Sequence, residues 1–63
     1  MSEPEILAHS IPEFCELLGI SVRTFYNLDY RGEAPPTFRI GTRRLVGYEA
    51  GRAWVKEREQ AAA

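Results

Sequence analysis

The sequence predicts a single small domain that is mainly α-helical with one β-hairpin, in the order helix, helix, hairpin, helix. Two serine-capped amphipathic segments, each ended by a glycine, follow one another after a short turn. A Pro-Pro pair then precedes two alternating segments around a glycine, and a helical segment with one tryptophan follows. With 63 residues, of which 44% are hydrophobic, we expect one domain over residues 1–63 with a thin core, ordered from about residue 6 to residue 59.

The first helix is predicted to begin at Ile11. Ser10 and Glu13 form a capping box with proline between them in the first turn, and Gly19 ends the helix. At about 100° per residue, one arc of this helix is apolar, and it contains Ile11, Phe14, Cys15, Leu17 and Leu18. Cys15 is therefore expected to be a small core residue. His9, which precedes the cap, has no partner for metal binding or catalysis.

A second helix is predicted to start after Ser21, its N-cap, and to stop at Gly32. Because it follows the first helix so closely, the pair has the spacing of a helix-turn-helix motif. The side chains expected to face the core are Val22, Phe25 and Leu28. Asp29 falls on the same inner side, where an isolated carboxylate is costly, so we expect it at the rim of the core or paired with an arginine.

A β-hairpin is predicted after Pro35-Pro36. Residues 37–40 alternate as a strand, Gly41-Thr42 form the turn, and residues 43–46 form the returning strand. The sequence leaves open whether the loop holds two or three residues, and a change of one residue moves Arg43 and Arg44 to the opposite faces. In both registers arginines cluster near the tip of the hairpin.

A third helix is predicted from Tyr48 or Glu49 to Glu59, with Trp54 at the centre of its apolar side. Gly51 costs roughly 1 kcal/mol relative to alanine in a helix interior, which indicates a close approach of another element at this position. The first few residues and residues 61–63 are expected to fray. The predicted core consists of Phe14, Leu18, Phe25, Leu28 and Trp54.

Composition argues against several classes of function. One cysteine and one histidine provide neither an internal disulfide nor a Cys/His zinc site, and no metal or other cofactor is expected. A domain this small has no room for a closed substrate pocket, and no nucleophile-base pair or phosphate-binding loop can be assembled, so we do not expect an enzyme. No apolar run approaches the ~20 residues of a membrane span and no segment resembles a signal peptide, which predicts a cytoplasmic protein.

The charge distribution indicates a nucleic-acid partner more clearly than the net charge of -1 does. Residues 1–20 carry four glutamates and no lysine or arginine, whereas residues 21–45 carry five arginines against two acidic residues. All basic groups of this middle segment are arginines, the side chain best suited to bidentate contacts with phosphate or guanine. An ordinary surface of mixed charge is the alternative, and the positions of the arginines in the fold decide between the two.

The predicted elements together describe a small winged helix-turn-helix domain. The sequence resembles the short excisionase and AlpA-like regulators of phages and integrated elements, which are related to the DNA-binding domain of MerR-type regulators. The resemblance covers about residues 6 to 58 and rests on LLGISVRTFYNL, RGEAPP, FRIGTRR and AGRAWVKER. Asp29 and Gly51 stand where that family usually has aliphatic residues.

The resemblance implies that the second helix enters the major groove of DNA and that the hairpin, as a wing, follows the adjacent minor groove or its phosphates. Arg23 is the best candidate base reader, because an arginine near the start of the helix can reach both acceptors of guanine. Thr24 is expected to contact a base through its methyl or hydroxyl group, and Asn27 to read adenine. Tyr30 and Arg31 are expected at phosphates, although the Tyr30 ring could instead cover the hairpin.

The predicted interface has two parts. In the second helix it comprises Ser21, Arg23, Thr24, Asn27, Tyr30 and Arg31. In the wing it comprises Arg39, Thr42, Arg43 and Arg44, which would meet the walls of the minor groove.

The function that this resemblance implies is that of an excisionase, a recombination directionality factor that binds and bends attachment-site DNA cooperatively and directs excision by an integrase, either a tyrosine or a serine recombinase. One alternative is a small phage or prophage transcriptional regulator with the same DNA-binding mode. An alternative of another class is a protein-protein adaptor whose arginine face meets an acidic partner. The bound protein would be associated with the nucleoid.

We expect a monomer in free solution, because the core uses all the apolar arcs and leaves no apolar face for a permanent dimer. On DNA, copies are expected to assemble head to tail. The outward Glu13 and Glu16 of one copy would then face the arginine wing of the next.

Overall fold

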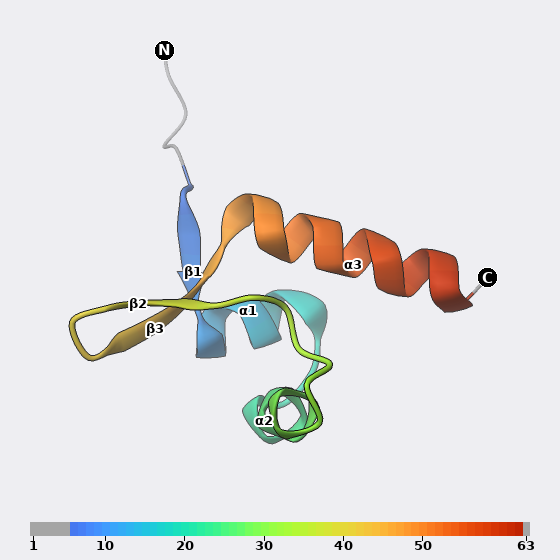
Figure 1. The fold of residues 1–63 in the computed structure, drawn as a ribbon, viewed down its shortest axis with the longest axis horizontal. Coiled ribbons are helices and arrows are strands. Elements are labelled where there is room, and N and C mark those ends of the chain that lie inside the picture. Colours follow the sequence, from blue (N-terminus) through green and yellow to red (C-terminus); the bar gives the residue numbers. More distant parts are fainter. Residues whose placement is uncertain (1–5, 63) are drawn as a thin grey trace, which may run out of the picture.

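A computed structural model describes residues 6–62 of the chain (Figure 1). In chain order the elements are β1 (Ala8–Ser10), α1 (Ile11–Leu18), α2 (Val22–Tyr30), β2 (Phe38–Ile40), β3 (Arg43–Gly47) and α3 (Tyr48–Ala62). Together they form a small mixed α/β domain, in which three helices accompany a three-stranded antiparallel sheet within the described residues. The predicted order of helix, helix, hairpin and helix is confirmed. The first residues of the chain and Ala63, which were expected to fray, lie outside residues 6–62.

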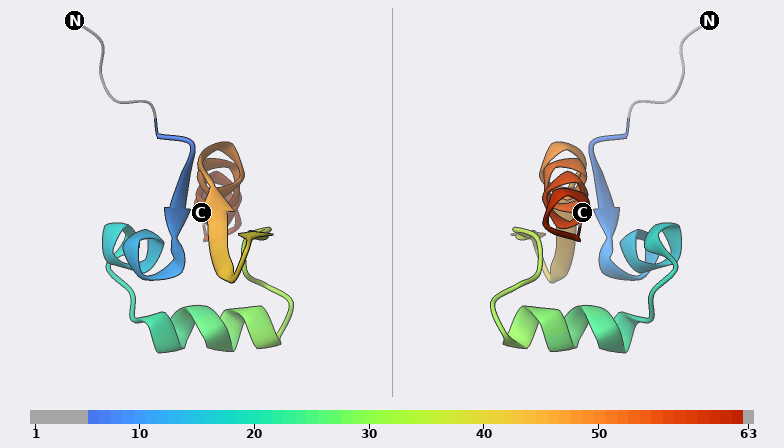
Figure 2. Two further views of the ribbon diagram at one scale, coloured as in Figure 1. Left: turned by 90° about the vertical axis from the view of Figure 1, so that its left-hand side faces the viewer. Right: turned by 90° about the vertical axis from the view of Figure 1, so that its right-hand side faces the viewer.

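The helices α1 and α2 begin and end close to the predicted positions. The side chain of Ser10 caps α1 by accepting a hydrogen bond from the Glu13 amide at 3.3 Å, and Ser21 caps α2 in the same way. Gly19 ends α1 with φ 77°, a left-handed conformation that glycine adopts without strain. The short connection turns the chain so that the two helices cross steeply (Figure 2).

The sheet contains one strand more than the sequence predicted. Its order is β1-β3-β2, and β1 pairs antiparallel with β3 from Ala8 opposite Gly47 to Ser10 opposite Leu45. This strand carries no alternating pattern of its own and forms because it completes the hydrogen bonds on the free edge of β3. It escaped prediction for that reason, since its stability comes from a distant segment of the chain.

The hairpin has a two-residue loop, which settles the register. Ile40 lies opposite Arg43, so Gly41 and Thr42 alone form the turn. Gly41 has φ 64°, and no residue other than glycine has positive φ in the described part of the chain. A positive φ at the first of the two turn residues alone fits a type II′ turn, whose twist matches that of paired strands.

The core lies where α1, α2 and β3 meet. Its buried cluster comprises Ile11, Phe14, Cys15, Phe25 and Val46. Of the predicted core residues, Phe14, Phe25 and Leu28 are buried, whereas Leu18 and Trp54 are partly buried at its margin.

Two residues expected to face the core are instead exposed. Leu17 is 66% exposed, because α1 is covered by the sheet and α2 on one side only and Leu17 lies toward the gap between α1 and α3. Val22 is exposed because it occupies the first position of α2, at the edge of the core. The helical periodicity was assigned correctly, but the apolar arc is wider than the surface that covers it.

The helix α3 leaves β3 directly and lies on the side of the molecule opposite α2 (Figures 1 and 2). It continues to Ala62 rather than ending at Glu59 as predicted. The close approach predicted at Gly51 is confirmed: a Cβ atom there would lie 2.9 Å from Cε1 of Phe14 and 3.3 Å from Cγ1 of Val46. Glycine at this position lets α3 pack directly on the core.

Among residues 6–62, no helix is both long enough and apolar enough to cross a membrane.

Candidate nucleic-acid interface

The outer face of α2 is open to solvent and carries polar side chains. Arg23, Asn27 and Tyr30 are exposed, and their spacing places them on one side of the helix. Tyr30 is 94% exposed, so its ring does not cover the hairpin. On the opposite side Phe25 and Leu28 are buried and anchor the helix to the rest of the domain. The outer face of α2 is therefore exposed on a helix whose inner face is held in the core.

The start of α2 is organised by two hydroxyl groups of the predicted interface. Oγ of Ser21 accepts a hydrogen bond from the Thr24 amide at 3.0 Å, and the two side-chain hydroxyls lie 2.9 Å apart. Both residues are exposed. Their orientation is therefore fixed by the helix cap, next to Arg23 in the first turn.

The hairpin register places the predicted arginines on two faces. Arg39 and Arg44 lie opposite one another, on the face that also carries the buried Val46. Arg43 lies opposite Ile40 on the other face. Arg39 and Arg43 are exposed, as is Thr42 in the turn, and the tip projects away from the helices (Figure 1). The tip of the hairpin thus presents a cation on each face.

Arg44 differs from the other arginines of the predicted interface, because its guanidinium is bound within the protein. Nη2 lies 2.8 Å from Oδ1 of Asp29, and Nε donates a hydrogen bond to Oγ1 of Thr37 at 2.9 Å. The hydrogen bond from Arg44 and its positive charge hold the pKa of Asp29 below its ordinary value of 3.8, although partial desolvation opposes this shift. The pairing of Asp29 with an arginine, one of the two predicted arrangements, is confirmed.

The remaining arginines of this region are free of such partners. In the described part of the chain, no salt bridge holds the side chains of Arg23, Arg31, Arg39 or Arg43. These four cations lie on α2, at its C-cap and on the hairpin. They are therefore available to an anionic partner.

The outer face of the hairpin is partly apolar, contrary to the expectation that no apolar face remains exposed. Ile40 is 64% exposed and Phe38 is also exposed, on the same face as Arg43. β2 is an edge strand of the sheet. The alternation of Phe38, Arg39 and Ile40 places the two apolar residues on one face, but only the fold shows that both are exposed there.

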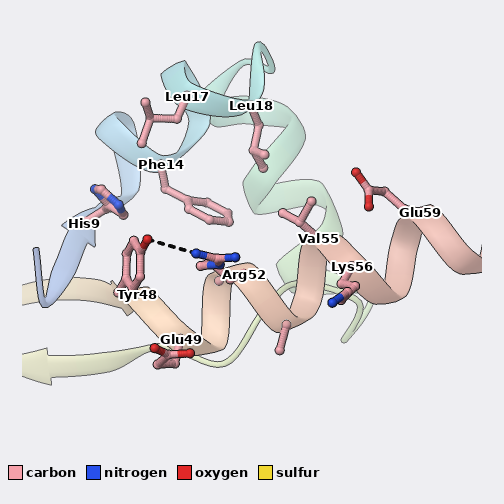
Figure 3. Close-up of a pocket in the computed structure, with 12 residues that line it drawn as sticks. His9, Phe14, Leu17, Leu18, Tyr48, Glu49, Arg52, Val55, Lys56 and Glu59 are labelled. Carbon is pink, nitrogen blue, oxygen red and sulfur yellow. Dashed lines mark hydrogen bonds between the residues drawn. The ribbon is translucent and has the colours of Figure 1, made fainter.

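A groove of about 620 Å³ runs between α1 and α3 (Figure 3). Phe14, Leu17 and Val55 form its apolar part, and at one end the Tyr48 hydroxyl accepts a hydrogen bond from Nη1 of Arg52 at 3.1 Å. The groove is open to solvent and differs from a closed substrate pocket.

Within residues 6–62, no three histidine, cysteine or acidic side chains lie close enough to hold a metal ion. Burial raises the pKa of the one thiol, that of Cys15, above its ordinary value of 9.0.

The helix α2 and the hairpin therefore present exposed polar and cationic side chains, which suit an anionic macromolecule. Comparison with known proteins found no matching family model, no matching curated protein and no matching solved structure.

Proposed function

We propose that this chain is a sequence-specific DNA-binding protein of the winged helix-turn-helix type. In this proposal α2 enters the major groove, and the hairpin acts as a wing on the adjacent minor groove or its phosphates. The order of elements differs from the standard winged arrangement, because α3 follows the hairpin and β1 adds a third strand. Neither addition covers the outer face of α2 or the tip of the hairpin (Figures 1 and 2).

The observation that carries the proposal is the set of exposed polar side chains on the outer face of α2. Arg23 and Asn27 are the side-chain types that bond guanine and adenine bidentately, and both are exposed on a helix whose other side is anchored in the core. Arg39 and Arg43 on the hairpin supply the cations that phosphates and a narrow minor groove attract. The acidic residues of α1 lie on a different helix, which explains how a protein with net charge -1 can still present a cationic surface.

Among DNA-binding roles we favour an excisionase that directs an integrase toward excision, and the resemblance of LLGISVRTFYNL and FRIGTRR to that family supports this choice. A transcriptional regulator would use the same residues in the same way. One small module buries only roughly 600 to 1,000 Å² on DNA, so several copies on repeated sites would be needed for useful occupancy. Repeated sites within an attachment region would suit the excisionase.

The test begins with selection of duplexes from a random pool at low salt, followed by footprinting. The footprinted DNA is the attachment site and the nearby promoters of the genetic element that encodes the protein. Protected repeats inside the attachment site support the excisionase, and protection confined to a promoter supports the regulator. If no duplex is retained at low salt by a folded protein, the DNA-binding proposal is overturned.

A protein-protein adaptor is the second candidate, and the exposed Phe38 and Ile40 beside Arg43 favour it. An apolar face bordered by a cation suits a partner that combines apolar and acidic side chains. The same selection experiment separates the two candidates. Failure to retain DNA, together with loss of partner binding in an Ile40→Ser variant, would favour the adaptor.

A further inference from the structure

The side chain of Arg44 connects the hairpin to α2. It starts from β3 and reaches Oδ1 of Asp29 on α2 at 2.8 Å, while its Nε holds Thr37 just before β2 at 2.9 Å. Among residues 6–62, no other side-chain hydrogen bond or ion pair joins α2 to the hairpin. The helix α2 otherwise packs chiefly against α1. Apolar packing of Phe25 on α2 and Val46 on β3 in the common core holds the base of the hairpin, and the Arg44 guanidinium is the polar link between α2 and the part of the hairpin nearer its tip.

Arg44 is poorly placed to bind a phosphate as well. Its side chain is 26% exposed, and two of its three nitrogens are already engaged by oxygen atoms of the protein. Arg43 and Arg39, its neighbour in sequence and its partner across the strands, are exposed and have no salt bridge in the described part of the chain. The hairpin thus has one arginine that faces α2 and two that are free.

We propose that Asp29 and Arg44 are a positioning pair, which fixes the hairpin at a set distance and angle from α2 so that both can engage one duplex together. This inference rests on the proposed DNA-binding function. Two elements that must meet adjacent grooves of a rigid duplex bind best when their relative position is fixed before binding, because less conformational freedom is lost in the complex. Arg44 contributes to DNA affinity through the placement of Arg39 and Arg43.

The alternative role for Arg44 makes an opposite prediction for Asp29. If Arg44 bound phosphate in the complex, Asp29 would compete for it and would repel the DNA, so Asp29→Asn would tighten binding. If the two residues are a positioning pair, Asp29→Asn weakens binding even though it removes a negative charge. The sign of the change in affinity therefore distinguishes the two roles.

The experiment measures affinity for a selected duplex over a range of salt concentrations. For the positioning pair, Asp29→Asn and Arg44→Gln each weaken binding by about tenfold, and the double variant is no weaker than either single one, because contacting residues are not additive. Glu33→Gln is the matched control: it removes an exposed carboxylate from the same region, one with no salt bridge in residues 6–62, and it leaves affinity unchanged or slightly improved. Tighter binding by Asp29→Asn, with a salt slope reduced by about 0.9 in Arg44→Gln alone, would overturn the proposal and assign Arg44 to a phosphate.

Footprints and a measurement without DNA complete the test. In Asp29→Asn, protection of the bases under α2 persists, whereas protection of the flanking minor groove under the hairpin is lost.

Spin labels at Asn27→Cys and Thr42→Cys report the distance between α2 and the hairpin tip in the free protein, and the thiol of Cys15 is too deeply buried to react. We expect a narrow distance distribution in the parent and in Glu33→Gln and a broad one in Asp29→Asn and Arg44→Gln. Equal widths in all four would overturn the pair as a positioning device whether or not the protein binds DNA. A narrow parent distribution without DNA binding would instead place the failure in the proposed function.

Discussion

The indole nitrogen of Trp54 donates a hydrogen bond of 2.9 Å to the main-chain oxygen of Glu33, in the segment that leaves α2. The same ring lies 6.2 Å from the ring of Phe14, measured between centroids, and the Arg58 guanidinium lies 5.3 Å above it. Trp54 is only partly buried. It therefore joins α3 to the core and to the chain after α2, instead of filling the centre of the core.

Trp54→Phe is expected to lower the free energy of unfolding by about 0.5 to 1.5 kcal/mol, because it keeps an aromatic ring on Phe14 but loses the hydrogen bond to Glu33. Trp54→Ala should cost more, about 2 to 3 kcal/mol, which is below the ~3 to 5 kcal/mol typical of a fully buried aromatic residue. Urea unfolding followed by circular dichroism measures both. Equal stability of Trp54→Phe and the parent would show that the hydrogen bond contributes nothing.

Gly51→Ala should destabilise the protein by about 1 kcal/mol, although alanine favours helix formation. The added Cβ would lie 2.9 Å from Cε1 of Phe14, so the ring must move within a packed core. Ala53→Gly, at an exposed position of the same helix, is the control and should cost about 1 kcal/mol through helix propensity alone. A rise in stability for Gly51→Ala would contradict the close packing of α3 on the core.

Lowering the pH should remove the contribution that the ion pair of Asp29 and Arg44 makes to stability. The pKa of Asp29 is lowered in the folded protein, so this contribution is complete above the ordinary Asp pKa of 3.8 and is lost as the pH falls through the lower, folded-state pKa. The gap in melting temperature between the parent and Asp29→Asn should therefore close at the acid end of the range. Thermal unfolding from pH 7 downward measures it. A gap that stays constant to the lowest pH would show that the carboxylate charge is not what stabilises the contact.

Arg23→Ala is expected to cost roughly 1 to 3 kcal/mol of specific DNA binding and to relax the choice of base at one position, because Arg23 lies exposed in the first turn of α2. The measurement compares affinity for a selected duplex, for its single-base variants and for random DNA. Arg31→Ala, at the C-cap of the same helix, serves as the comparison and should weaken binding to all duplexes alike. Equal losses on specific and random DNA for Arg23→Ala would limit Arg23 to a phosphate contact.

Copies of the protein are expected to fill adjacent sites cooperatively. The exposed Glu13 and Glu16 of α1 would face Arg39 and Arg43 on the hairpin of the next copy, and the exposed Ile40 would add an apolar contact. Titration of duplexes with one, two or three copies of the site, followed by gel retardation and bending assays, measures this. Glu16→Lys should reduce cooperativity and leave single-site affinity intact. Independent filling of each site by the parent would contradict head-to-tail assembly.

Much of the fold was predictable from local signals. Ser10, Gly19 and Ser21 fix the ends of α1 and α2 through caps and a left-handed turn, which depend only on residues close in sequence. The packing role of Gly51 was also predictable, because a glycine inside a helix lowers helix stability and therefore indicates a structural reason such as close packing.

The features that escaped prediction depend on distant segments. The strand β1 exists because of the free edge of β3, and Leu17 is exposed because α3 leaves a groove above it. The position of Arg44 depended on a register that the sequence left open between two loop lengths. In the candidate site, helical periodicity predicts that the polar side chains of α2 are exposed. Only the fold shows that Arg44 is bound to Asp29, whereas Arg39 and Arg43 are exposed.

The pairing of β1 with β3 has a consequence for the time at which the protein folds during its synthesis. Ala8–Ser10 hydrogen-bond to β3, the Tyr48 amide donates to the Leu7 carbonyl at 2.9 Å, and Phe14 packs beside Gly51. While the ribosome has released only α1 and α2, these early segments lack the partners that would stabilise them. At a synthesis rate of about 5 to 20 residues per second, they wait roughly a second or more for β3 and α3 to be made. The nascent chain therefore completes its core late, and on a ribosome stalled before β3 the helices α1 and α2 would have only one another to pack against.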